Sequence, residues 1–93
     1  MTEDITDSGR FVPAGDLEIT PVPDGAMIYQ KDRERVHYLN PTALMVLELC
    51  GMGKTVAEIV AFVSDSFGLS TAPVDEIRTC IDLLIEEELV RRA

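Results

Sequence analysis

Residues 36–50 read VHYLNPTALMVLELC, and the apolar pattern changes in the middle of this stretch. Its first four residues are β-branched, aromatic or aliphatic, which predicts a short strand. Asn40 followed by Pro41 predicts a helix start. The Asn side chain can accept a hydrogen bond from a free backbone N–H, and Pro at the first helical position gives up a donor that has no partner there. We therefore predict a strand ending at Leu39 and a largely buried helix from Pro41 to about Cys50.

Two more strands are predicted before this point. Apolar residues alternate around residues 17–20 and again at 26–29, with the turn-forming sequence PVPDG at residues 21–25 between them. Three strands joined by short connections make an antiparallel meander. Residues 1–10 are polar and acidic and are predicted to be a disordered tail, which leaves residues 11–93 as a single domain.

Two helices are predicted after the first. The TVAE sequence at residues 55–58 has capping-box spacing, so a second helix begins at Thr55 and stops near Gly68. A third helix runs from Pro73 to near Glu88. The fold class is therefore α+β, with a three-stranded antiparallel sheet followed by three helices, as in a winged helix-turn-helix.

After the third helix, Leu89 and Val90 are predicted to pack back on the sheet.

The charge balance argues against two classes of partner, nucleic acids and membranes. The 93 residues hold 8 Lys and Arg against 17 Asp and Glu, a net charge of −9. Phosphates and anionic membrane surfaces reward clustered basic residues, so neither nucleic acid nor a membrane is expected as a partner. Cys50 and Cys80 both lie in apolar stretches and read as free thiols of a reducing compartment. With no targeting segment or apolar run of membrane-spanning length, we expect a cytoplasmic protein.

No residue pattern predicts catalysis, a metal site or a cofactor. His37 is the only histidine, and no cysteine or carboxylate cluster has metal-ligand spacing. The GMGKT sequence at residues 51–55 lacks the first glycine of a phosphate loop, and we interpret it as a turn plus a helix cap. We therefore expect a protein that is not an enzyme by itself.

Two other functions stay open as alternatives. Ser66 after Asp65 resembles the attachment site of an acyl-carrier protein, although it falls at the end of a predicted helix. A winged-helix nucleic-acid-binding domain has the same predicted elements, but its third helix would carry one arginine against six carboxylates, a net charge of −5.

The apolar arc of the third helix is about 200° wide, whereas packing on one side needs about 100°. Either the helix is wedged between the sheet and the other helices, or the excess borders a groove beside the edge of the third strand. In such a groove an extended peptide could add a strand.

Four segments together resemble the PqqD-like family: VHYLNPTA at residues 36–43, LELC at 47–50, TVAEI at 55–59 and LIEEELV at 84–90. Members of this family include precursor-peptide recognition elements of ribosomal peptide natural-product pathways. The resemblance extends over about residues 16–90. One departure is the first interhelical turn, where family members commonly have Asp-Gly and this chain has GMGK at residues 51–54.

The resemblance implies a winged-helix arrangement in which the leader segment of a precursor peptide docks as a fourth strand, with the third helix as the other wall. The backbone groups implied to pair with it belong to Val36, His37, Tyr38 and Leu39. The side wall implied on the third helix consists of Ile77, Arg78, Ile81 and Ile85. The opposite flank of this helix, Cys80 and Leu83, stays open as an alternative wall.

The resemblance also implies partners. Family members deliver the precursor peptide to a modifying enzyme, often a radical iron–sulfur enzyme, or to a leader-removing protease, and the chemistry belongs to that partner.

Overall fold

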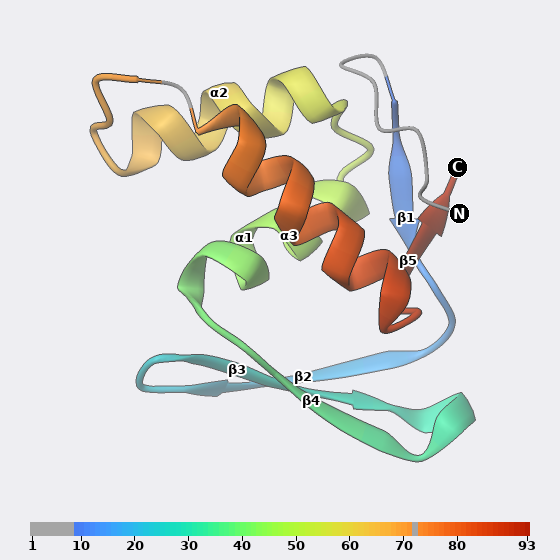
Figure 1. Cartoon of the computed structure of the whole chain (residues 1–93). Helices are drawn as coiled ribbons and strands as arrows, with labels where there is room; N and C mark the ends of the chain where they lie inside the picture. The colour runs from blue at the N-terminus through green and yellow to red at the C-terminus, as the bar shows by residue number, and fades with distance from the viewer. Residues whose placement is uncertain (1–8, 72) are drawn as a thin grey trace.

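The computed structural model describes residues 9–71 and 73–93, which form two small sheets and three helices (Figure 1). In chain order the elements are β1 (Phe11–Pro13), β2 (Leu17–Val22), β3 (Gly25–Gln30), a 3₁₀ turn η1 (Lys31–Arg33), β4 (Arg35–Leu39), α1 (Pro41–Gly51), α2 (Val56–Ser66), α3 (Val74–Glu86) and β5 (Val90–Arg92).

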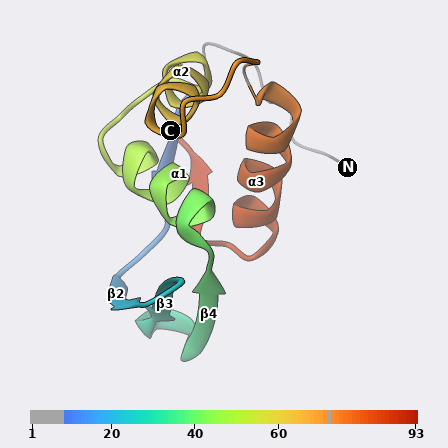
Figure 2. The same ribbon diagram turned by 90° about the vertical axis from the view of Figure 1, so that its left-hand side faces the viewer.

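The larger sheet has the predicted antiparallel order β2-β3-β4, which confirms the α+β class. Figures 1 and 2 show this sheet as a layer with all three helices on one side of it. Alternation along β3 follows from that arrangement, because Ala26 and Ile28 are fully buried toward the helices while Tyr29 is exposed. β4 is one edge of the sheet and leads directly into α1.

The C-terminal segment differs from the prediction that residues 89 and 90 pack on this sheet. Val90 instead pairs with Pro13, and β5 with β1 forms a separate two-stranded sheet. The chain is turned there by Glu88, whose φ of 60° lies in the left-handed region, so that the Leu89 C=O accepts a hydrogen bond from the Ala14 N–H at 2.8 Å. This pairing joins segments nearly 80 residues apart in the chain, and no local sequence pattern predicts it.

Both predicted helix caps are present. Asn40 Oδ1 accepts a hydrogen bond from the Ala43 N–H at 2.8 Å at the start of α1. Before α2, the Thr55 side chain accepts from the Glu58 N–H at 3.2 Å, and the Glu58 carboxylate accepts from the Thr55 N–H at 2.8 Å. These contacts hold the pKa of Glu58 below its ordinary value. α3 is shorter than predicted at both ends and has no side-chain cap at Pro73.

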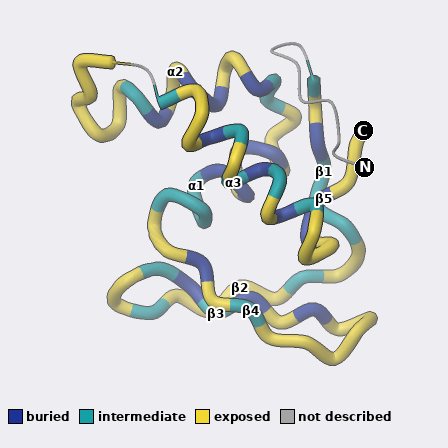
Figure 3. Tube along the Cα trace, in the orientation of Figure 1, coloured by how far each residue is buried: buried dark blue, intermediate teal, exposed yellow. Residues whose placement is uncertain are grey.

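The core is almost entirely aliphatic, and α1 is its central element, contacting β1, β3, β4, α2 and α3. Figure 3 shows the buried residues gathered where the helices meet one another and the sheet. Cys50 is fully buried among them, Cys80 is partly buried, and both thiols are free.

Most of the predicted tail falls outside the described residues, since the structure describes only Gly9 and Arg10 of it. These two lie against the start of α2, where the Val56 N–H donates to the Gly9 C=O at 3.0 Å. Within the described ranges, no helix is long and apolar enough to cross a membrane.

Candidate functional site: an open strand edge beside α3

The register of the sheet decides which backbone groups of β4 are unused. Pro23 and Asp24 form a two-residue turn between β2 and β3, so the closing pair Val22 and Gly25 is a hydrogen-bonded pair. Hydrogen-bonded and non-hydrogen-bonded pairs alternate along antiparallel strands. The next residue of β3, Ala26, therefore directs its N–H and C=O toward β4.

On β4, the residues paired with Ala26, Ile28 and Gln30 are Leu39, His37 and Arg35. Their backbone groups face β3. The N–H and C=O groups of Val36 and Tyr38 point the opposite way, to the free edge of the sheet. The register thus corrects the implied set, because the backbone groups of His37 and Leu39 are directed to β3 and only those of Val36 and Tyr38 are free to pair with an added strand.

A groove of about 480 Å³ lies along this free edge, with α3 as its other wall. Its volume falls within the range of ligand-binding pockets, roughly 300–1,000 Å³. The residues that line it are Val36, His37, Tyr38, Leu39, Asn40, Ala43, Cys80, Leu83, Leu84, Glu87 and Leu89. β4 therefore contributes all four residues that the resemblance implied.

The wall contributed by α3 is the flank that the sequence left as the alternative. Ile77 and Ile81 are fully buried in the core, and neither lines the groove. Ile85 faces a different hollow, beside Gln30 and β5, and Arg78 is partly buried outside the groove lining.

The physical reason lies in how the wide apolar arc of α3 is used. Its middle, Ile77, Ile81 and Leu84, packs on the core, and one edge, Cys80 and Leu83, is left facing β4. Leu83 remains 54% exposed, so it has apolar surface to offer a ligand.

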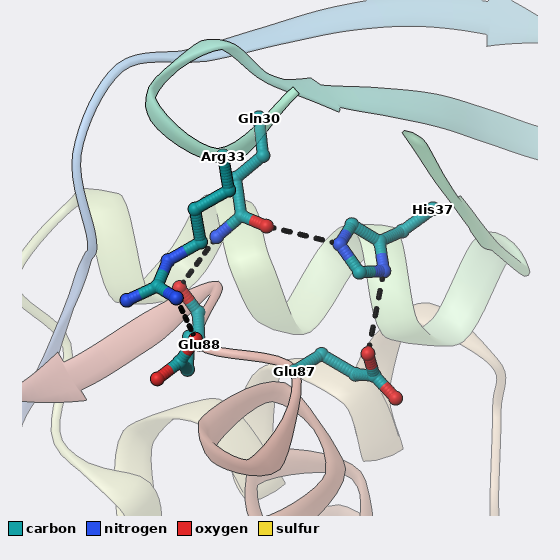
Figure 4. A network of polar contacts seen from close by, with 5 residues as sticks. All are labelled: Gln30, Arg33, His37, Glu87 and Glu88. Atoms are coloured by element: carbon teal, nitrogen blue, oxygen red, sulfur yellow. Dashed lines mark hydrogen bonds and ion pairs between the residues drawn. The ribbon is translucent and has the colours of Figure 1, made fainter. Parts of the chain in front are cut away.

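A network of polar side chains joins the β3–β4 hairpin to the C-terminal end of α3 (Figure 4). Gln30 is 2% exposed, and its Nε2 donates to the Glu88 C=O at 2.7 Å. Its Oε1 lies 3.0 Å from His37 Nε2. Arg33 forms an ion pair with the Glu88 carboxylate. These contacts connect the β3–β4 hairpin to the residues that follow α3, and two of the residues involved, His37 and Glu87, also line the groove.

The contacts of Gln30 assign a hydrogen-bonding role to one ring nitrogen of His37. Gln30 uses its amide N–H₂ on a carbonyl, so its Oε1 can only accept, and His37 Nε2 must donate. The other ring nitrogen, Nδ1, lies 3.5 Å from a Glu87 carboxylate oxygen, and this contact becomes an ion pair when the ring is protonated. Only 14% of the His37 side chain is exposed, so the ring serves as part of the groove floor.

Sequence reasoning identified His37 as a site residue but missed Gln30, Glu87 and Glu88. Gln30 and Glu88, which are in contact, are 58 residues apart in the chain. The available signal was the spacing of two that places Gln30 on the same side of the strand as Ala26 and Ile28. Burial raises the pKa of Cys80 to about 11, which is the opposite of the shift that activates a thiol nucleophile. Among the described residues, no three His, Cys, Asp or Glu side chains come together as a metal site.

Comparison with known families adds one finding to this geometry. The family model described as coenzyme PQQ synthesis protein D (PqqD) matches residues 25–90, which include the whole β4–α3 groove. The chain belongs to the PqqD family. PqqD proteins are accessory, non-catalytic recognition elements of ribosomally made, modified peptides. No curated protein and no solved structure matches the chain.

Proposed function

We propose that this PqqD-family protein is a peptide-binding adaptor. It binds the leader segment of a ribosomally made precursor peptide by strand addition at the free edge of β4 and presents the precursor to a modifying enzyme or a leader protease. It needs no cofactor or metal for this, and the bond-making chemistry belongs to the partner enzyme. We expect the encounter in the cytoplasm, where the ribosome releases the precursor.

One observation carries this proposal: the outward backbone groups of Val36 and Tyr38 border a largely apolar groove whose other wall is α3. An added strand satisfies its own N–H and C=O groups on the β4 edge, which gives affinity that is independent of sequence. Alternate side chains of that strand point toward Cys80, Leu83 and Leu84, which gives selectivity.

The proposal is tested by selecting random dodecapeptides displayed on phage against the immobilised protein in a buffer with EDTA. We expect enrichment of peptides that bind saturably, one per protein, in a titration of the synthetic peptide. Binding that requires added metal, or no enrichment at all, contradicts the proposal.

Two variants on opposite flanks of α3 locate the site. Leu83→Asn removes half-exposed apolar surface from the groove and should weaken binding of the selected dodecapeptide by about 1 kcal/mol, roughly fivefold in Kd. Ile85→Asn makes the same chemical change outside the groove and should lower thermal stability while leaving affinity unchanged. Equal loss of affinity in both variants, with both folded by circular dichroism, contradicts a site at the β4–α3 groove.

A further inference from the structure

The side of the large sheet that turns away from the helices carries apolar residues on two of its strands. Met27 stands opposite Tyr38 and Tyr29 opposite Val36, and these four residues define the outer face. Val36 is 58% exposed and Tyr38 53% exposed. Antiparallel sheets with one covered face usually place polar residues on the other. The outer face departs from that rule on β3 and β4.

Tyr38 is held in place on this outer face. Its hydroxyl donates a hydrogen bond to the Asp24 C=O in the β2–β3 turn. The ring is therefore fixed along the sheet surface before any ligand arrives, and ordering it on binding costs little conformational entropy.

Strand addition at β4 brings a peptide to both sides of the sheet. The peptide residue opposite His37 points to the same side as His37 and enters the groove. Its two neighbours, opposite Val36 and Tyr38, point to the other side. Directly opposite side chains in a sheet have Cβ atoms about 4.5–5.5 Å apart and interact. This holds for a peptide running in either direction, because side chains alternate in both.

We propose that the protein selects the bound peptide by its side chains on both sides of the sheet, in the groove and on the outer face. The peptide carries at least three consecutive apolar residues, of which the middle one enters the groove and the flanking ones, β-branched or aromatic, pack on Val36 and Tyr38. This inference rests on the proposed function and adds the chemical class of the bound segment, a strand that is apolar on both faces.

The choice between an apolar strand and an alternating one follows from burial. Polar flanking residues would leave Val36 and Tyr38 partly in water, while apolar ones remove surface from water on both partners. The groove by itself favours an apolar side chain only at the middle residue of the peptide. The outer face favours apolar side chains at the two neighbouring residues.

The test is the dodecapeptide selection repeated on four proteins, with each enriched pool sequenced. Peptides enriched on the parent should share an apolar triplet. Selection on Tyr38→Thr, which keeps strand propensity but removes the ring, should lose the preference at one flanking position. Selection on Leu83→Asn should lose it at the middle position. Tyr29→Thr is the matched control, because it removes an aromatic ring from the outer face one strand away, about 10 Å from the added strand, and should leave all three preferences unchanged.

A fifth selection, on Tyr38→Phe, checks that a lost preference does not come from a fold defect. This variant keeps the ring without the hydroxyl contact and should keep the flanking preference. Enriched peptides with polar residues on both sides of one apolar residue overturn this inference and leave the proposed function standing. Equal effects of Tyr29→Thr and Tyr38→Thr also overturn it. A selection with no enrichment on any of the four proteins overturns the proposed function and this inference with it.

Discussion

Replacement of Val36 by proline tests strand addition most directly. The Val36 N–H points to the free edge and has no partner within the sheet, so removing it should change the stability of the fold little. Proline also keeps apolar volume at this position on the outer face. The change therefore separates the backbone contribution to peptide binding from the side-chain contribution.

The magnitude follows from the hydrogen bond that disappears. A backbone hydrogen bond contributes about 0.5–1.5 kcal/mol net, and a peptide carbonyl left buried without its donor costs about 1–3 kcal/mol. Taking about 1–3 kcal/mol for the variant, the Kd for a selected dodecapeptide should rise roughly 5- to 150-fold.

The other edge of the same sheet supplies the matched control. On β2, Ile19 forms a non-hydrogen-bonded pair with Ile28, so its N–H also points to an open edge. Ile19→Pro makes the same backbone change away from the groove and should leave affinity unchanged. Fluorescence anisotropy with a labelled dodecapeptide measures both Kd values, and circular dichroism checks both folds. A folded Val36→Pro protein that binds within twofold of the parent refutes strand addition at β4.

Three further outcomes are expected. Because the pKa of Cys80 is raised to about 11, the rate of its alkylation by iodoacetamide should increase about tenfold per pH unit below that value. Saturating dodecapeptide should slow this alkylation, measured by mass spectrometry, because Cys80 lines the groove. An alkylation rate that the peptide leaves unchanged would place the peptide elsewhere. Glu87→Gln should slow association of a lysine-bearing dodecapeptide at low salt, measured by stopped flow, whereas an on-rate indifferent to salt would mean that the acidity does not steer peptides. Gly25→Ala should lower stability by more than about 1 kcal/mol, because the φ of 146° is unsuited to alanine and its Cβ would overlap the Leu39 carbonyl oxygen. Thermal unfolding of the variant at the parent temperature would contradict this.

Local features of the fold were predictable because neighbours in sequence decide them. The Asn40 cap and the Thr55–Glu58 capping box each involve residues three positions apart, and both are present. The alternation of buried and exposed residues along β3 is likewise local, because it depends only on which side of one strand each residue faces. The β4 half of the site followed from the resemblance, which depends on the same short segments.

The sequence by itself determined the class of fold, the order of the three meander strands and the three helices, and the strand that borders the groove. Only the tertiary structure decided which flank of α3 faces that strand, because all of the wide apolar arc satisfies a helical pattern and packing alone selects Ile77 and Ile81 for the core. It also decided that Val90 pairs with Pro13 and that Gln30 reaches Glu88. Such contacts join residues far apart in the chain, and their partners are set by how the layers pack rather than by any local spacing.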